Sequence, residues 1–487
     1  MKSGASVLSY AVRPRAIGYY LAQLLVVLAA LTLVPLLVSL YYGDYAFTWR
    51  LGAVAILLVL AGAPLLRLPA PTEIRTNEAL VVVALTFVVA SLLMSYPLAA
   101  GGLTAIDAWL ESVSGVTTTG LSTVARPSGE PHTFLFLRSF MQWFGGLGIV
   151  VLSLALLTGH HMAAHRLVQP GADEPLATTA RTHARRMLDV YLVLTACGIA
   201  LLWALGLNGF DAIVHVMSAV STGGFSSFDG NLGGMAGWAP RFAVVILGFC
   251  GTLPLVLYYR AFHGEWRVAL QDVELRGLVT AVILVGALMS GLLFAGAGLG
   301  GRQSIANGLL LGLSAQTTAG FASLRIAQLG AAAKLVLILA MAVGGGVGST
   351  AGGIKMLRLM ILLRLVQVTV RRTAAATHAV VEPRLAGRVL EQDDIARAAL
   401  LMFLFFLVVL LSWLVFVAWG YAPIDALFEV TSAAATAGLS TGITAATLAT
   451  PLKVLLGLDM LLGRLEIVAL LVLFYPPTWF GKRGEAQ

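Results

Sequence analysis

Charged side chains are scarce in this sequence: Asp, Glu, Lys and Arg together make up 11% of its 487 residues. A soluble domain carries about 25%. So little charge cannot cover a water-exposed surface of this size, which excludes an ordinary soluble protein. The net charge of +8 is therefore interpreted first as a guide to orientation across a membrane, and no nucleic-acid partner is expected.

Cysteine is also nearly absent. Cys197 and Cys250 both fall inside apolar runs, so neither a disulfide framework nor a cysteine-based metal site is expected. The sequence contains no phosphate-binding loop and no arrangement of a nucleophile beside a base. We therefore expect no enzymatic activity and no cofactor on this chain.

Long apolar runs dominate what remains. Hydrophobic residues make up 59% of the chain, and runs such as 17–40 and 399–417 pass the roughly 18 residues that a membrane helix needs. The first run is too long for a signal-peptide core, so it is predicted to span the membrane. Ten full spans are predicted, near 17–41, 51–68, 79–98, 134–158, 188–207, 240–260, 277–298, 332–365, 398–420 and 452–475.

Four weaker segments lie between spans, beginning near Asp107, Asp211, Asn307 and Asp425. Apolar segments of about 10–14 residues are typical of re-entrant structure. If the N-terminus is inside and all four enter and leave from the outside, the inner segments hold 22 of the 31 Lys and Arg residues, the outer segments 8, and a span the remaining Arg464. This bias follows the positive-inside rule, so both termini are predicted to be cytoplasmic.

These four segments are copies of one another. They share the pattern [D/N]-x6-S-x3-T-x-G-[LF]-[SA] without a gap, and each sits between two spans. Because internal repeats determine the whole fold, we predict a unit of span, short helix, Thr-x-Gly loop and span, repeated four times. The copies read DAWLESVSGVTTTGLS (107–122), DAIVHVMSAVSTGGFS (211–226), NGLLLGLSAQTTAGFA (307–322) and DALFEVTSAAATAGLS (425–440).

The predicted fold is therefore an all-α polytopic membrane protein with four tandem span–pore-helix–filter–span repeats around a central pore. Two extra spans occupy 1–75 and precede the repeats. The predicted boundaries of the repeats are 76–160, 185–262, 275–372 and 395–476, with cytoplasmic loops at 161–184 and 373–394.

The repeated pattern has a physical interpretation. Asp or Asn at its first position is predicted to be a helix N-cap. A helix of about ten residues, roughly 15 Å long, then reaches mid-bilayer and points the negative end of its dipole there. Glycine permits positive φ, so the carbonyls that follow can turn toward the axis. Irregular backbone at that depth is tolerated only inside protein or around a water-filled cavity, and rings of carbonyls form potassium filters.

The four loops TTTGLS, STGGFS, TTAGFA and TAGLST, with the span-helix-span repeat, resemble the Trk/Ktr/HKT superfamily of potassium transporters over about residues 79–475. GGGVGSTAGGIK (344–355) and LLGRLEIVALL (461–471) support the resemblance, and the two extra spans are similar to the TrkH-type bacterial pore subunit. The potassium-binding filter that this implies comprises Thr118, Thr119, Gly120, Thr222, Gly223, Gly224, Thr318, Ala319, Gly320, Thr436, Ala437 and Gly438.

The resemblance also implies partners and selectivity. It implies that the chain dimerises in the bacterial inner membrane and is gated by a cytoplasmic TrkA-like regulatory subunit that binds NAD(H) or ATP/ADP. Glycine at all four filter positions implies potassium rather than sodium. One departure is Ala322, where the other copies have Ser, and we expect it to alter hydration just past the filter. Glu111, His215 and Glu429 share one position in three repeats, with Leu311 in the other, and are expected to be buried with partners behind the filter.

A possible gate lies 26 residues beyond each filter glycine. Three of these positions are small or uncharged, and the one in the fourth repeat is Arg464. A charge near mid-membrane costs about 2.5–3.5 kcal/mol on insertion scales and usually faces a cavity or a partner. Our hypothesis is that Arg464 faces the pore and sets the barrier to ions. The alternative is a structural ion pair with Glu466 or Asp459.

The third repeat carries a cluster of glycines in the middle of its second span. Each costs about 1 kcal/mol in a helix interior, so we predict a break and an irregular loop that can occlude the pore. Close helix packing through small residues is the alternative. Lys355 is expected to reach inward or to form an ion pair near the pore. The predicted gate residues besides Arg464 are Gly344, Gly345, Gly346, Gly348, Gly352, Gly353 and Lys355.

The function predicted is potassium uptake through a channel-like pore. A proton- or sodium-coupled potassium symporter is the alternative, since such carriers also have repeats and broken helices, although usually inverted ones. A receptor or scaffold would leave four matched loops unexplained.

Overall fold

The computed structural model describes residues 11–71, 74–158, 176–296, 298–374 and 382–480. In these ranges the regular structure is helical apart from one hairpin, β1 (Arg384–Leu385) paired with β2 (Arg388–Val389). The predicted all-α fold class is confirmed. Of the predicted loop 161–184, the part before residue 176 lies outside the described residues.

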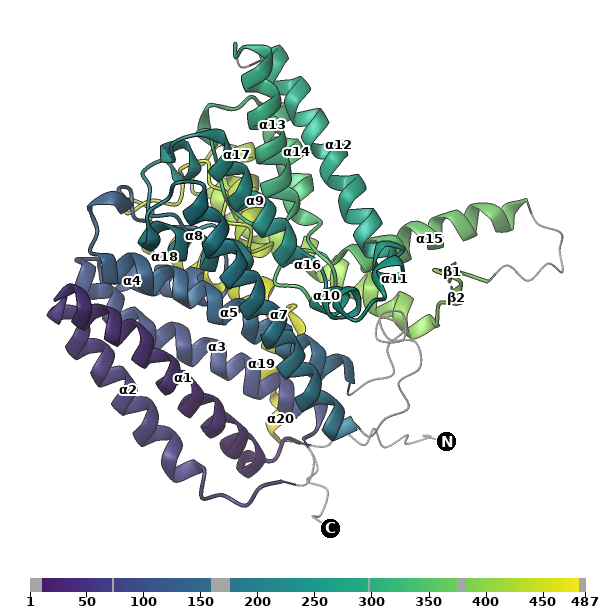
Figure 1. Ribbon diagram of the computed structural model, residues 1–487. Helices are drawn as coiled ribbons and strands as arrows, with labels where there is room; N and C mark the ends of the chain where they lie inside the picture. The colour runs from purple at the N-terminus through teal and green to yellow at the C-terminus, as the bar shows by residue number, and fades with distance from the viewer. Residues whose placement is uncertain (1–10, 72–73, 159–175, 297, 375–381, 481–487) are drawn as a thin grey trace, which may run out of the picture.

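Helices α1 (Pro14–Tyr42) and α2 (Tyr45–Leu65) form a hairpin at one edge of the molecule (Figure 1). The chain reverses at Gly43, whose φ of 75° suits a residue without a side chain. The carboxylate of Asp44 then accepts the backbone N–H of Thr133, which ties this hairpin to the first repeat.

Each of the four predicted repeats contains a long first helix, a short helix and a second helix. The first helices are α3 (Thr76–Leu98), α7 (Leu176–Ala204), α12 (Val273–Gly296) and α16 (Gln392–Ala418). The short helices are α4 (Ala105–Val116), α8 (Gly209–Val220), α13 (Gly301–Gln316) and α17 (Pro423–Ala434). The second helices are α5 (His132–Thr158), α9 (Trp238–Thr252), α14 (Ala331–Ala342) and α18 (Thr450–Arg464).

Further short elements join or extend these helices. The 3-10 turns are η1 (Ala99–Gly101), η2 (Pro127–Gly129), η3 (Asn231–Gly234) and η4 (Ile326–Gln328). The remaining helices are α10 (Leu255–Phe262), α11 (Trp266–Leu270), α15 (Met356–Thr373), α19 (Val468–Phe474) and α20 (Pro476–Phe480). Figure 1 shows α15 running outward from the body of the bundle.

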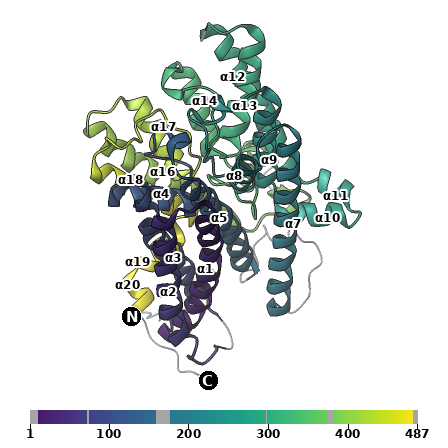
Figure 2. The ribbon, with the colours of Figure 1, turned by 60° about the vertical axis from the view of Figure 1, so that its left-hand side comes forward.

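The second helix of each repeat packs on the short helix of the next repeat: α5 on α8, α9 on α13, and α14 on α17. The series closes, because α18 packs on α4 of the first repeat. Figure 2 shows α4 beside α17 and α18, which come from the far end of the chain. The four repeats therefore form a ring.

Two ion pairs, one buried and one partly buried, join neighbouring repeats in this ring. The Nζ of Lys334 on α14 lies 2.7 Å from Oδ1 of Asp425 on α17. The Nζ of Lys453 on α18 lies 2.6 Å from Oδ1 of Asp107 on α4, and both side chains are about 95% buried. Each pair sets a lysine near the start of a second helix against an acid in the first turn of the next short helix, where the helix dipole favours negative charge.

The sequence pattern predicts that this acid is the helix N-cap, and that prediction is wrong. Thr104 caps α4 and accepts the N–H of Asp107, while Asn208 caps α8 and accepts the N–H of Asp211. The acids occupy the third helical position, and their carboxylates bond back to the cap side chains. A carboxylate in the first turn serves the dipole equally well and leaves its oxygens free for partners.

Three of the four second spans are interrupted. The predicted span 240–260 is broken: α9 and α10 meet at an angle of 91°, and Pro254 stands at the bend, where it removes an N–H donor and blocks a continuous helix. The predicted span 452–475 is also broken, because α18 and α19 are separated at 465–467. In the third repeat, residues 343–355 form a loop between α14 and α15.

Among the described residues, seven helices are long and apolar enough to cross a membrane, and the bent pair α9–α10 makes an eighth. The other two of the ten predicted spans correspond to the interrupted second spans of the third and fourth repeats. The two described ends of the chain meet, since the N–H of Val12 donates to the carbonyl of Thr478 at 2.9 Å.

The pair at the junction of the last and first repeats gives a stability prediction. Lys453→Met leaves the buried carboxylate of Asp107 without its cation, and breaking a buried pair in this way costs about 3–5 kcal/mol. We expect a clearly lower melting temperature for the purified variant. The measurement is the protein that remains in the size-exclusion peak after heating to a series of temperatures. The control is Glu382→Gln, which breaks a pair with Arg384 that is about half exposed and should change little. Equal thermal stability of the two variants would contradict the prediction.

Candidate functional site

The four Thr-x-Gly loops share one unusual backbone conformation. The threonines have φ values of 55°, 54°, 51° and 47° at Thr118, Thr222, Thr318 and Thr436. Positive φ recurs two residues later, with values of 92°, 82°, 73° and 81° at Gly120, Gly224, Gly320 and Gly438. In every repeat, therefore, two residues with positive φ flank a middle residue that does not have it.

Each loop leaves its short helix through the same turn. In the first repeat, the N–H of Thr118 donates to the carbonyl of Gly115, and the N–H of Thr119 donates to that of Ser114. These two bonds define a Schellman motif, in which the left-handed position is normally glycine. The other three repeats form the equivalent bonds. A β-branched residue in this position is strained by about 1–3 kcal/mol, so the threonine side chain must serve a purpose that outweighs the strain.

The four loops enclose a common axis with no space between them. A Cβ atom added to Gly120 would lie 2.1 Å from the carbonyl oxygen of Gly223, the middle residue of the next loop. The filter glycine of each loop lies similarly close to a carbonyl of the next loop, and the glycine of the fourth loop lies close to a carbonyl of the first. The remaining contacts of such a Cβ are Gly224 to Ala319 at 2.7 Å, Gly320 to Ala437 at 2.4 Å, and Gly438 to Thr119 at 2.1 Å.

Polar side chains support the loops from behind in three repeats. His215 Nε2 pairs with the hydroxyl of Ser226 at 2.8 Å, and Glu429 accepts the hydroxyl of Ser440 at 2.6 Å. Glu111 likewise accepts the hydroxyl of Ser122. All three groups are fully buried with partners, as the sequence suggests.

In the third repeat, Leu311 and Ala322 occupy the two positions of this pair. The loss of the serine therefore accompanies the loss of its partner. In the other three repeats, the serine at the position of Ala322 bonds a side chain of the short helix behind the loop. The expected effect on hydration is not needed to explain this departure.

Arg138 on α5 joins the first and second loops. Its Nε donates to Glu111 at 3.0 Å and its Nη2 donates to Ser122 at 2.8 Å. Its guanidinium also lies 3.9 Å from the ring centroid of Phe225 in the second loop. One buried cation thus fixes two adjacent loops relative to each other.

The loop at 343–355, called the intramembrane loop below, lies against the threonine end of the ring. The N–H of Gly352 donates to the hydroxyl of Thr318 at 2.9 Å, and the hydroxyl of Thr222 lies 3.4 Å from that of Thr350. A Cβ on Gly352 would lie 2.0 Å from Oγ1 of Thr436. The loop therefore contacts the threonines of three repeats at this end of the ring.

The interruption in the second repeat supports the intramembrane loop. Because α9 ends at Thr252, its last carbonyls have no helical partner. The carbonyl of Thr252 accepts the N–H of Gly346 at 3.1 Å, and that of Gly251 accepts the N–H of Thr350 at 3.2 Å. Irregular backbone in both repeats is thereby satisfied inside the protein, as a membrane environment requires.

Glu274, at the start of α12, holds the other side of the intramembrane loop. Its buried carboxylate accepts the N–H of Val347 at 3.2 Å and that of Leu357 at 3.1 Å. Lys355, another predicted gate residue, is buried and donates to the carbonyl of Ala351 within the same loop. It therefore closes the loop on itself instead of reaching into the pore.

Arg464 is buried at the end of α18 and bridges two other repeats. Its Nη1 donates to the carbonyl of Thr350 at 2.7 Å, and its Nη2 donates to the carbonyl of Gly145 on α5 at 3.2 Å. The alternative of an ion pair with Glu466 or Asp459 is wrong. Glu466 binds Arg358 instead, and Asp459 accepts the hydroxyl of Ser412.

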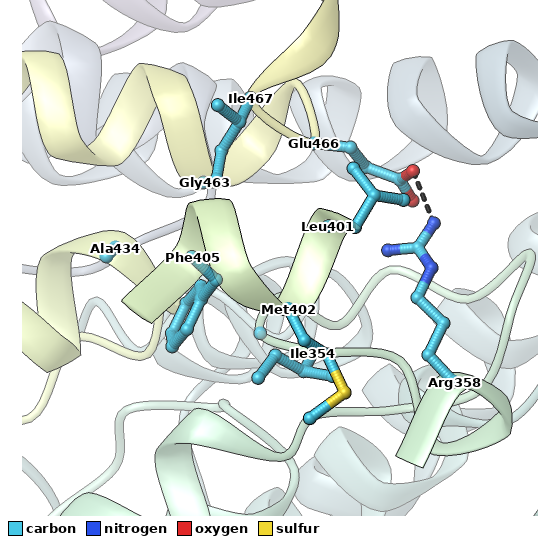
Figure 3. Close-up of a pocket in the computed structure, with 10 residues that line it drawn as sticks. Ile354, Arg358, Leu401, Met402, Phe405, Ala434, Gly463, Glu466 and Ile467 are labelled. Atoms are coloured by element: carbon cyan, nitrogen blue, oxygen red, sulfur yellow. Dashed lines mark hydrogen bonds and ion pairs between the residues drawn. The ribbon is translucent and has the colours of Figure 1, made fainter. Parts of the chain in front are cut away.

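A cavity of about 30 Å³ lies between the interruptions of the third and fourth repeats. Figure 3 shows Arg358 of α15 reaching across it to Glu466, with an Nη2–Oε2 distance of 2.5 Å. Glu466 and Ile467 have φ values of 53° and 63°, so the backbone between α18 and α19 is strained.

A larger cavity of about 570 Å³ opens at the glycine end of the ring. Its walls include Gly320, Gly438 and the loops that follow them, together with Asp229. The hydrogen bond from the Ser128 hydroxyl holds the pKa of Asp229 below its usual range, so this carboxylate is ionised at neutral pH. The ring thus lies between this cavity, called the vestibule below, on its glycine side and the intramembrane loop with Arg464 on its threonine side.

Comparison with known proteins assigns this architecture. The model of the TrkH family, described as a cation transport protein, matches residues 49–271 and 299–478. The chain belongs to the TrkH family. It is 32% identical over 475 residues to the Trk system potassium uptake protein TrkH of Halomonas elongata, covering 94% of this chain and 97% of that one. It is 29% identical over 465 residues to an uncharacterized cation transporter of Methanocaldococcus jannaschii, covering 94% of each.

The fold agrees with a solved structure of the same family. The crystal structure of the potassium transporter TrkH from Vibrio parahaemolyticus superposes with a TM-score of 0.86 at 27% identity, over 96% of this chain and all of that one. These relatives are transporters and not enzymes, as the sequence predicts. A TrkH-family chain is thus a multi-pass membrane protein, and its ring of loops is the natural candidate for the cation path.

Several residues of this TrkH-family site escape sequence reasoning. The buried Arg138 pairs with Glu111, 27 positions away, and the buried Glu274 accepts the N–H of Val347, 73 positions away. No local sequence pattern reveals either partner. Lys334 and Lys453 carry a usable signal, since both stand near the start of a second span. Pro254 in mid-span likewise signals the bend in the second repeat.

The closeness of the loops gives a second prediction. Gly438→Ala places a methyl group against the carbonyl of Thr119, whereas Gly442→Ala meets nothing within 4 Å, although both glycines have positive φ. Both variants incur the left-handed cost of about 1–2 kcal/mol. We expect only Gly438→Ala to abolish cation flux, measured as isotope uptake into proteoliposomes at matched protein content. Similar flux in the two variants would show that contact across the ring is unimportant.

Proposed function

We propose that this chain takes up potassium through a channel-like pore in which the four Thr-x-Gly loops form the selectivity filter. The potassium-specific names of its relatives from Halomonas elongata and Vibrio parahaemolyticus support the choice of ion. The observation that carries the proposal is the closed ring of four loops with identical left-handed threonines and glycines.

The chemistry of the ring suits a dehydrated monovalent cation. Backbone carbonyls and threonine hydroxyls are neutral oxygen ligands that can replace an ion's water shell. The C-terminal ends of four short helices, each with a partial negative charge, point toward the same axis. The hydroxyls of Thr118 and Thr436 are buried and have no hydrogen-bond partner among the described residues, which leaves their oxygens available to an ion.

The proposed filter residues are those of the sequence prediction, from Thr118–Gly120 to Thr436–Gly438. Ions would enter from the vestibule at the glycine end, where the carboxylate of Asp229 favours cations. They would leave at the threonine end once the intramembrane loop moves. The contacts of this loop with the threonines support a closed exit in this conformation.

The gate in this proposal is the intramembrane loop with Arg464. The guanidinium lies next to the closed exit and opposes the passage of potassium electrostatically. Its two bonds to the carbonyls of Thr350 and Gly145 also hold the loop in place. Opening requires both bonds to break.

The remaining expectations concern the setting of the pore. We propose that the chain forms a homodimer in the bacterial inner membrane, with both termini in the cytoplasm. The names of relatives from Halomonas elongata refer to a Trk system, which supports control by a cytoplasmic TrkA-like subunit that carries NAD(H) or ATP/ADP. The meeting of Val12 and Thr478 supports termini on one side of the membrane.

A potassium symporter coupled to protons or sodium is the second candidate function. Recording from the purified chain in planar bilayers separates the two, because a channel gives unitary currents that reverse at the potassium equilibrium potential. Growth of a potassium-uptake-deficient bacterial strain at low potassium tests the broader proposal. Failure to restore growth despite normal membrane expression would refute it.

The gate can be tested by removing its charge. Arg464→Ala deletes two bonds to the closed loop and the adjacent positive charge, so we expect potassium flux to rise. Flux is measured as rubidium-86 uptake into proteoliposomes. Arg384→Ala, which removes an exposed arginine far from the ring, is the matched control and should leave flux unchanged. Unchanged or lower flux in correctly folded Arg464→Ala would count against this role.

A further inference from the structure

A glutamine from the first repeat bonds to a carbonyl of the second filter loop. Gln142 lies on α5 and is fully buried. Its Nε2 donates to the carbonyl oxygen of Gly223 at 2.7 Å. Its Oε1 accepts the hydroxyl of Ser218 at 2.8 Å and the N–H of Phe225 at 3.3 Å. The amide therefore holds the second loop on both sides of the Gly223–Gly224 peptide.

This contact occurs in one repeat out of four. The residues at the corresponding place in the second helices of the other repeats are Gly248, Ala342 and Met460. None of these residues has a side chain that can donate a hydrogen bond to a filter carbonyl. The fourfold pattern is thus broken at one position by a polar group that reaches the ion path from outside the loops.

The second loop is also exceptional in its own sequence. Its middle residue is Gly223, whereas the other loops have Thr119, Ala319 and Ala437 there. A Cβ on Gly223 would lie 2.3 Å from the Cδ of Gln142. The glutamine amide fills the space that a side chain takes in the other loops. Two consecutive glycines leave the backbone free to rotate, so this loop needs a restraint that the others carry themselves.

We propose that Gln142 is a positioning residue that sets cation selectivity by fixing the carbonyl of Gly223 in the filter ring. The inference rests on the proposed function of the ring. That carbonyl lies against Gly120 in the same relation that the other three loops show. The glycine pair therefore adopts the common geometry, and the amide of Gln142 is what keeps it there.

The bond has a cost that explains its single occurrence. A carbonyl that accepts an N–H bond shares its electron density between the donor and a bound cation, so a donor at all four loops would weaken the ring as a ligand. At one loop, the gain in order outweighs this loss. Without the amide, the Gly223 carbonyl can rotate away from the axis, and a less regular ring discriminates less between potassium and sodium.

The test is the ratio of potassium to sodium permeability, from reversal potentials of the full-length chain in planar bilayers. Gln142→Met keeps the side-chain volume and removes both polar atoms. We expect its ratio to fall about two- to tenfold, the factor that one hydrogen bond is worth. Met460→Ala alters the equivalent position of the fourth repeat, which has no bond to a filter carbonyl, and should keep the wild-type ratio.

A compensating pair tests the mechanism. Gly223→Ala alone clashes with the amide and should lose conduction. Gly223→Ala combined with Gln142→Ala makes the second loop like the third and fourth, so we expect conduction and selectivity to return. If Gln142→Met is as selective as the wild type, or if the double variant conducts without selectivity, the inference is overturned. A wild-type chain that does not prefer potassium would instead refute the proposed function.

Discussion

The contact between each filter glycine and the carbonyl of the next loop is the constraint on which the rest of the structure depends. It leaves no space for a side chain, so the glycines are required by the neighbouring repeat as much as by their own φ angles. It also sets the distance between the four short helices, which must bring their loops together within a few tenths of an ångström. The ion pairs between repeats, the guanidinium of Arg138 and the polar pairs behind the loops all maintain that distance.

The two sides of the ring of loops are built on different principles. Around the filter, side chains form short, fully paired contacts such as His215 with Ser226, which favour a single conformation. At the other end, the second spans are broken and exchange backbone hydrogen bonds, as Gly346 does with Thr252. Bonds of this kind can be remade with new partners at little cost. Rigidity around the Thr-x-Gly loops therefore comes from buried side chains, and adaptability on the other side of the ring comes from backbone hydrogen bonds.

The features predictable from the sequence were those that recur. Four copies of Thr-x-Gly between apolar spans were enough for the all-α fold and the family, and the cluster of glycines marked an irregular segment at 343–355. Features that arise from one repeat touching another were not predictable. The partners of Arg464 are carbonyls on two other repeats, and carbonyls have no sequence signature. The nearby acids Asp459 and Glu466 were plausible by proximity and wrong, because α16 and α15 supply their partners.

The N-cap error has a similar origin. Asp107 and Asp211 are conspicuous in the aligned repeats, whereas their caps, Thr104 and Asn208, lie three residues earlier and differ between copies. The acids are conspicuous because they recur, but their partners differ: Asp107 pairs across the ring with Lys453, whereas Asp211 bonds Ser227 of its own repeat. Strain at the threonines could not be foreseen either, since a β-branched residue is a poor choice for a left-handed position when judged locally.

The closure of α18 on α4 has one more consequence. Three of the four junctions in the ring are also joined by the chain itself, but the fourth repeat meets the first through non-covalent contacts alone. Lys453 with Asp107, Gly438 against Thr119, and Arg464 with Gly145 all lie along this junction. This junction has no covalent connection, so no segment of the chain resists an expansion of the ring there. Arg464 links the fourth repeat to the first at the one junction that the polypeptide does not join covalently.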